Sequence, residues 1–170
     1  MKPILNDVHS QLNETEVLQV VRPQTLAGIQ EIVREAREKK TPISVAGGRH
    51  AMGGQQFASE SLHIDVTWMS RVLDTDPVEG LLHIEAGADW PAIIQASHGM
   101  DASNGKVWGI RQKQTGVDSV TLAGSISANA HGRGLLMQPL GDDIENLTLV
   151  DARGEVVFCN REENSELFSL

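Results

Sequence analysis

The chain has 170 residues, of which 40% are hydrophobic, which is typical of one folded domain with a hydrophobic core. Its 23 acidic residues outnumber its 14 basic ones, for a formal net charge of −9. This charge excludes a surface built for nucleic acid or anionic lipid, so a phosphorylated ligand would have to be bound locally, by backbone amides and a few side chains.

The chain has one cysteine, Cys159, which excludes an internal disulfide and a cysteine-based zinc site. The N-terminus has no apolar run typical of a signal peptide, and no span approaches the roughly 20 apolar residues of a membrane helix. We therefore expect a cytoplasmic protein without a membrane span, and we expect Cys159 to pack on a strand.

The first third of the chain predicts a strand, a helix and a second strand. Residues 16–22 form the first strand, and Thr25 caps a helix over 26–40 with its apolar residues on one face. Pro42 ends the helix, and residues 43–46 form a buried strand. This strand leads into the glycine-rich stretch PISVAGGRHAMGGQQF at 42–57.

Further strands are predicted at 62–66 and 81–86. Asp89 caps the next helix, which has Pro91 in its first turn and ends at Gly99. Residues 100–119 lack periodicity and are expected to be loop.

The stretch TLAGSISANAHGRG, from residue 121, has few bulky side chains, which indicates a helix or turn with something packed against its backbone. Residues 144–151 and 155–159 predict a hairpin, and a helix begins at residue 164. An apolar segment at the end of the chain indicates a fragment of a longer protein.

The glycine-rich loop matches neither of the two common nucleotide motifs. Gly47 and Gly48 are adjacent, which breaks the G-x-G-x-x-G spacing, and Gly54 and Gln55 stand where a P-loop needs Lys and Ser/Thr. Consecutive residues at positive φ can still point several amides into one concavity and bind a pyrophosphate. The alternative is a tight turn between strands.

The stretch from residue 121 offers a second clamp on the same ligand, from the Thr121 and Ser127 hydroxyls and from exposed amides near Gly124. Two separated Gly/Ser-rich segments, each following an apolar element, indicate one long ligand lying between them.

Together the two stretches resemble the FAD-binding domain of the vanillyl-alcohol oxidase / p-cresol methylhydroxylase family of FAD-linked oxidases. GGRHAMGGQ is similar to the family's pyrophosphate loop G-x-G-H-S-x-x-G-Q, with Ala51 in place of the serine. TLAGSISANAHG is similar to its T-x-G-G-x-x-S motif, with Ala123 in place of the first glycine. The motifs lie about 70 residues apart in the family's order.

The resemblance implies an α+β fold with two subdomains, a small sheet with helices at 1–70 and a second mixed or antiparallel sheet at 71–170. It also implies that the FAD-binding domain is incomplete at its C-terminus and that the substrate domain is absent. FAD is the implied cofactor. The implied cofactor-binding residues are Ala46, Gly47, Gly48, Arg49, His50, Ala51, Gln55, Gly116, Thr121, Gly124, Ser125, Ser127 and His131.

Two histidines carry further expectations from the resemblance. In family members with a histidine at the position of His50, the imidazole is joined to the flavin 8α-methyl group; the alternative is a loop histidine that hydrogen-bonds backbone, and Arg49 departs from the family's glycine. Ser119 stands where some relatives carry a second, cysteine tether. His131 is the tentative catalytic residue, with helix termination as the alternative.

The implied function is an FAD-dependent oxidoreductase that takes a hydride from an alcohol-type or sugar-like CH–OH substrate to flavin N5. The alternatives are a flavin-binding module without catalysis of its own, and a non-flavin α/β domain. His63, His83 and His98 lack metal-ligand spacing, and strand positions on alternate faces explain them better than a zinc site. We expect no bound metal and no nucleic-acid partner.

Overall fold

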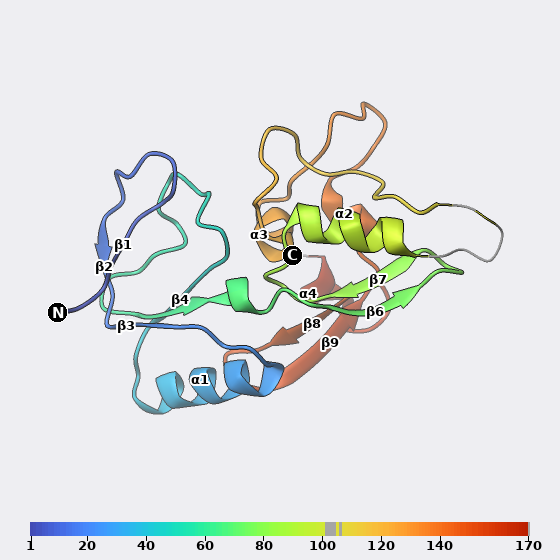
Figure 1. Cartoon of the computed structure of the whole chain (residues 1–170). Helices are drawn as coiled ribbons and strands as arrows, with labels where there is room; N and C mark the ends of the chain where they lie inside the picture. Colours follow the sequence, from blue (N-terminus) through green and yellow to red (C-terminus); the bar gives the residue numbers. More distant parts are fainter. Residues whose placement is uncertain (101–104, 106, 170) are drawn as a thin grey trace.

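The computed structural model of this protein describes residues 1–100, 105 and 107–169 (Figure 1). Residues 101–104 and 106 of the predicted loop, and Leu170 of the predicted last helix, lie outside the described residues. The strands are β1 Ile4–Leu5, β2 Thr15–Glu16, β3 Gln19–Val21, β4 Ile43–Ala46, β5 Leu62–Asp65, β6 Val72–Asp76, β7 Leu81–Ile84, β8 Asn146–Val150 and β9 Val156–Asn160. The helices are α1 Leu26–Glu38, α2 Trp90–Gly99, α3 Leu122–Ser127 and α4 Ser165–Phe168, with 3₁₀ turns at Val66–Trp68 and Leu140–Asp143. The α+β class is confirmed.

The first half of the chain is built on a small parallel sheet of order β3-β5-β4. Helix α1 connects the two outer strands, and β5 pairs with both of them. Thr25 caps α1 as predicted, because its side chain accepts a hydrogen bond from the Gly28 amide. The glycine-rich loop begins where β4 ends, beside the end of β5.

The strand predicted over residues 16–22 is two strands, because the chain changes partners within it. Thr15 and Glu16 pair antiparallel with β1, whereas Gln19–Val21 pairs parallel with β5. Between them Val17 is fully buried, and the Leu18 amide donates to the Ser61 carbonyl. The pattern of apolar residues was continuous across this switch, so it did not reveal the break.

The second half contains two antiparallel hairpins, β6-β7 and β8-β9. The β8-β9 hairpin confirms the prediction at 144–159, with Leu149 opposite Val157. Strand β6 was not predicted; it carries three residues with charged or hydroxyl side chains and is largely exposed, so it lacks the apolar alternation that marks a strand. Cys159 lies on β9 and is buried, as expected.

The best-defined core of the second half lies under α2, which packs over β7 (Figure 1). Asp89 caps this helix as predicted by accepting from the Ala92 amide. Its core cluster consists of Ala88, Trp90, Ile93 and Leu140, packed against partly buried Leu82, Ile84, Ile110, Val120, Leu122 and Ile126. Helix α3 is therefore held against α2.

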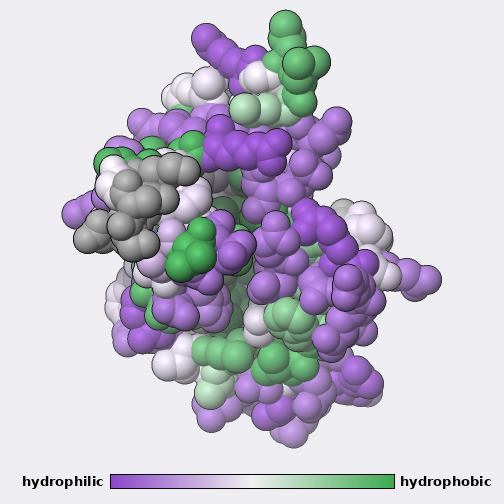
Figure 2. Space-filling view, turned by 90° about the vertical axis from the view of Figure 1, so that its right-hand side faces the viewer, coloured by the Kyte–Doolittle hydropathy of each residue, from purple (hydrophilic) through white to green (hydrophobic). Residues whose placement is uncertain are grey.

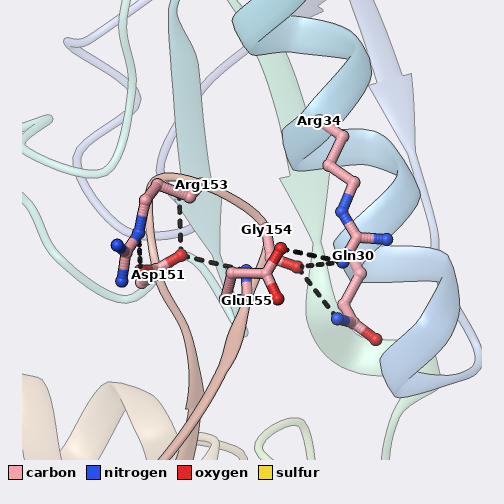
Figure 3. A network of polar contacts seen from close by, with 6 residues as sticks. All are labelled: Gln30, Arg34, Asp151, Arg153, Gly154 and Glu155. Atoms are coloured by element: carbon pink, nitrogen blue, oxygen red, sulfur yellow. Dashed lines mark hydrogen bonds and ion pairs between the residues drawn. The ribbon is translucent and has the colours of Figure 1, made fainter.

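Polar contacts at the turn of the β8-β9 hairpin join it to α1 (Figure 3). The Gly154 carbonyl accepts from Gln30 Nε2 at 2.9 Å and from Arg34 Nη2 at 2.8 Å. Gly154 has φ of 77°, and a Cβ there would lie 2.6 Å from Arg34 Cγ. The Asp151 carboxylate shapes the turn by accepting from the Glu155 and Arg153 amides. These hydrogen bonds, together with one from the Arg153 guanidinium, lower the pKa of the Asp151 carboxyl to about 2. The contact between the hairpin turn and α1 thus requires glycine at position 154.

The face of the molecule in Figure 2 is mostly hydrophilic, with its hydrophobic residues in separate groups. Apart from the terminal Met1, the most exposed large hydrophobic residues are Leu135 and Leu136, with exposed fractions of 100% and 98%. In the part of the chain that the structure describes, no helix has the length and apolar character to cross a bilayer.

Candidate functional site

The glycine-rich loop packs directly against the chain that leads into α3, so the structure brings the two predicted segments together. A Cβ atom on Gly47 would overlap the Thr121 hydroxyl and would lie 2.8 Å from Thr121 Cγ2. A Cβ atom on Gly48 would lie 2.8 Å from the Ser119 carbonyl oxygen. The contact between the segments therefore requires residues without side chains at 47 and 48.

The loop backbone has the conformation expected of an anion-binding concavity. Arg49 lies in the left-handed region at φ of 56°, a conformation uncommon outside glycine, and Gly54 follows at 71°. Within the described residues, no hydrogen bond outside helices and strands has an amide of residues 48–53 as its donor. Amides that lack protein acceptors beside positive-φ residues are what a pyrophosphate needs.

An N-terminal turn, residues 6–13, holds the loop from the other side, and sequence reasoning missed it. The Val8 amide donates to the Arg49 carbonyl at 3.1 Å, and Asn13 Nδ2 donates to the Met52 carbonyl at 2.7 Å. A Cβ on Gly54 would lie 2.9 Å from Asn13 Oδ1. The cluster of Asn, Asp and Ser in NDVHSQLN was the available signal for a turn, although not for what it contacts.

Buried Asp7 organises this N-terminal turn. Its carboxylate is 2% exposed and accepts from the His9 amide, the Ser10 amide and hydroxyl, and Asn13 Nδ2, at 2.6 to 3.0 Å. Burial alone raises the pKa of the Asp7 carboxyl, but the hydrogen bonds from Asn13 and Ser10 outweigh it and hold that pKa well below its usual range. Asp7 is therefore a fixed anion around which the turn folds.

His50, the residue expected to meet the flavin, has both ring nitrogens in contact with protein. Nδ1 lies 2.9 Å from His9 Nε2, and Nε2 lies 3.2 Å from the Ser119 carbonyl oxygen. The His50 side chain thus bridges the N-terminal turn and the segment before α3.

Helix α3 differs from the expected second clamp. Thr121 is 3% exposed and caps the helix by accepting from the Gly124 amide at 3.3 Å. The Leu122 and Ala123 amides donate to the Ala88 and Ala86 carbonyls. The prediction of exposed amides near Gly124 is therefore wrong, because the amides of the first turn are used to join α3 to the chain before α2.

The remaining predicted residues are spread over several environments. Ser125 points into the core, where its hydroxyl accepts from Trp90 Nε1 and donates to Gln114 Oε1. His131 is exposed, and the hydrogen bond found for its ring is to the carbonyl of its neighbour Gly132. Ala46 is buried at the end of β4, Ala51 is partly buried, and Gln55, Ser127 and Gly116 are exposed, the last at φ of 95°.

A separate buried polar cluster lies within the parallel sheet. His63 Nδ1 is 2.8 Å from Ser44 Oγ, which is 2.7 Å from Ser61 Oγ. All three residues are buried, so the serine and histidine are structural partners. Burial lowers the pKa of the His63 imidazole, and the charges of Arg49 and Arg22 add to this against the opposing effect of Asp65. Among the described residues, no three His, Cys, Asp or Glu side chains gather as metal ligands.

The residues of the loop fit an FAD pyrophosphate. Among the described residues, the loop offers amides at 48–53 without protein acceptors, positive φ at Arg49 and Gly54, and a close-packed base at Gly47 and Thr121. This fit needs no basic patch, which agrees with a chain of net charge −9.

Comparison with known proteins finds dehydrogenases and oxidases named for sugar lactones. Similar proteins include an L-galactono-1,4-lactone dehydrogenase of Brassica oleracea, with 25% identity over 99% of this chain and 28% of its own length. An L-gulono-1,4-lactone dehydrogenase of Mycobacterium tuberculosis has 28% identity over 81% of this chain and 30% of its own length. An L-gulonolactone oxidase of Bos taurus has 27% identity over 86% of this chain and 32% of its own length. The chain thus spans about a third or less of these relatives.

Solved structures show the same fold. A carbohydrate oxidase from Microdochium nivale superposes with a TM-score of 0.76 at 21% identity, covering 98% of this chain and 37% of that one. A BBE-like protein of Physcomitrella patens gives a TM-score of 0.75 at 18% identity, covering 96% of this chain and 34% of that one. Residues 17–160 match the FAD binding domain family. The chain therefore belongs to the FAD binding domain family of the FAD-linked oxidoreductases, and its cofactor is FAD.

Proposed function

We propose that this chain supplies the FAD-binding part of an oxidoreductase that oxidises a CH–OH carbon of a sugar-like small molecule. The observation that carries the proposal is the loop at 47–54: its amides at 48–53 have no acceptor among the described residues, and its left-handed backbone fits a pyrophosphate. The substrate class is supported by relatives named for sugar lactones and by a structural neighbour named as a carbohydrate oxidase.

Each part of the site has its own task in this proposal. FAD bound here would supply the hydride acceptor, flavin N5, for oxidation of the substrate carbon. The amides of residues 48–53 hold the pyrophosphate, and Thr121 and Ser119 support the loop from beneath. The N-terminal turn holds the loop through the Arg49 and Met52 carbonyls. Binding thus depends on a backbone shape that is set before the ligand arrives.

The family resemblance extends the proposal to a covalent link between His50 and the flavin. The support is that a histidine stands at the linking position within this loop. Both nitrogens of the ring already contact protein, so the link requires release of either His9 or Ser119. Acid precipitation of the flavin-loaded protein decides this: colour in the pellet supports the link, whereas colour wholly in the supernatant contradicts it.

The second candidate function is a flavin-binding module that does not turn over substrate by itself. Two observations favour it: the chain spans about a third of its relatives, and His131 makes no hydrogen bond to the loop in the described structure. We propose that this chain alone binds FAD without oxidising sugar lactones. Reduction of bound FAD by such a lactone under anaerobic conditions would contradict that.

The central experiment is a visible absorption spectrum and an FAD titration of the purified protein. The wild type should show flavin absorbance and saturable binding. Gly47→Val should abolish both, because a side chain there overlaps Thr121. Gly99→Ala is the control, since a Cβ at that position meets no atom of the described residues within 4 Å. Absence of FAD binding by the wild type would overturn the proposal.

A further inference from the structure

The match to the FAD binding domain family begins at residue 17, yet a residue before that point contacts the proposed FAD site. His9 Nε2 lies 2.9 Å from His50 Nδ1, and the two ring centroids are 5.0 Å apart with planes tilted by 52°. The contact therefore joins a segment outside the family match to the centre of the pyrophosphate loop.

His9 is held in place by its own segment. The Asp7 carboxylate accepts from the His9 amide at 3.0 Å, and the same carboxylate binds Ser10 and Asn13. On either side of His9, the Val8 amide and Asn13 Nδ2 are hydrogen-bonded to carbonyls of the loop. The imidazole is thus presented to His50 from a turn that is fixed on both sides.

The hydrogen-bonding capacities of the groups fix the arrangement of protons. A carbonyl oxygen only accepts, so the contact between Ser119 and His50 requires the hydrogen on His50 Nε2. In the neutral ring Nδ1 then carries the lone pair, and it accepts the Nε2 hydrogen of His9. Each neighbour fixes one nitrogen, and together they leave His50 one ring orientation.

We propose that His9 is a positioning residue of the FAD site. It holds His50, and through it the backbone at 48–51, in the shape that receives the pyrophosphate. The proposal rests on the proposed function of the loop. It adds to that function a residue, His9, and a segment, 6–13, that preorganise the site from outside the family match.

FAD titrations of the protein and its variants test this role. His9→Phe keeps a ring but loses the donor, and it should weaken FAD binding by about 10-fold, a modest preorganisation effect. His9→Gln, whose amide can donate in place of Nε2, should restore most of the affinity. His98→Gln, at an exposed position on α2, should bind like the wild type. Unchanged affinity in His9→Phe would overturn the proposal.

A double-mutant cycle separates positioning from general loss of structure. If His9 acts through His50, then His9→Phe should have little further effect on FAD affinity in a His50→Phe background. Equal losses in both backgrounds would show that His9 acts elsewhere and would overturn the proposal. The free energy of unfolding in urea is measured for each variant as well. If the loss of FAD affinity simply parallels the loss of stability across the variants, the positioning role is contradicted.

Nitrogen NMR of histidine-labelled protein without FAD supplies a readout independent of the cofactor. The His50 Nδ1 resonance should have the shift of a hydrogen-bonded acceptor in the wild type and in His9→Gln, and should move toward that of a free acceptor in His9→Phe. An unmoved resonance in His9→Phe would overturn the positioning role. Failure of the wild type to bind FAD would contradict the proposed function instead, and the NMR result would still decide whether His9 positions His50.

Discussion

The Thr121 side chain occupies the space that a Cβ atom on Gly47 would need, so the two cofactor motifs are in contact through a residue pair 74 positions apart in the sequence. Gly47→Ala should therefore destabilise the protein by about 1–3 kcal/mol, the usual cost of overpacking, and should weaken FAD binding. Urea unfolding and FAD titration measure the two effects. Gly99→Ala is the control, and an equal effect of both substitutions would contradict the packing argument.

The Thr121 hydroxyl also caps α3, and Thr25 plays the same part for α1. Thr121→Val and Thr25→Val should each cost about 1 kcal/mol, the typical contribution of an N-cap. Only Thr121→Val should also weaken FAD binding, because only Thr121 borders the glycine loop. Equal FAD affinities of the two variants would mean that Thr121 serves α3 alone.

Arg71 and Glu85 form a two-pronged ion pair beside β7. The Arg71 guanidinium donates from Nη2 to Glu85 Oε1 at 2.6 Å and from Nε to Oε2 at 3.2 Å, and the Arg71 backbone amide also donates to Oε2 at 2.8 Å. Glu85 is 7% exposed. Hydrogen bonding from Arg71 holds the pKa of the Glu85 carboxyl below its ordinary value, against the opposing effect of burial. Arg71→Met should therefore lower the urea midpoint near neutral pH by leaving a buried carboxylate without its cation.

The acid dependence of this pair follows from the direction of the pKa shift. Its contribution is fully present above the ordinary glutamate pKa and is lost as pH falls through the lower pKa of the folded state. The difference in midpoint between wild type and Arg71→Met should therefore narrow in acid. Arg153→Met, which breaks the more exposed pair with Asp151, is the control and should lower the midpoint less. A difference that widens in acid would contradict this account.

His63 should make stability depend on pH in a less acidic range than the Arg71–Glu85 pair does. Its pKa in the folded protein lies below the ordinary 6.5, so the unfolded chain binds the proton first as pH falls below that value. As pH falls from 6.5 to the pKa of His63 in the folded protein, the free energy of unfolding should decrease by at most about 1.4 kcal/mol per pH unit. Urea unfolding across this range should show a shallower slope for His63→Asn, and an unchanged slope for the exposed His83→Asn. A slope that is the same in His63→Asn would show that other groups cause it.

Local features of the fold were predictable because their chemistry acts over a few residues. The caps at Thr25 and Asp89 each bind an amide three residues ahead, and the β8-β9 hairpin pairs residues that are close in sequence. The two Gly/Ser-rich stretches predicted one ligand lying between them, and the direct contact of Gly47 with Thr121 was not predicted.

What the sequence did not reveal depends on distant partners. Ser125 belongs to a ligand-facing motif by its position, but its hydroxyl is taken by the Trp90 indole, 35 residues earlier. The turn around Asp7 reads as a polar loop, and only its contacts with residues 49 and 52 show what it does. Neither relationship produces a periodic pattern in the sequence, because each depends on one or two side chains.

The bonds from Gln30 and Arg34 to the Gly154 carbonyl imply an order of folding. They connect residues 124 and 120 positions apart, whereas β6-β7 and β8-β9 close within short stretches of chain. Closing a longer loop costs more chain entropy, so such contacts tend to follow the local ones. On the ribosome, α1 is made early but cannot gain this support until the hairpin turn has emerged, near the end of these 170 residues.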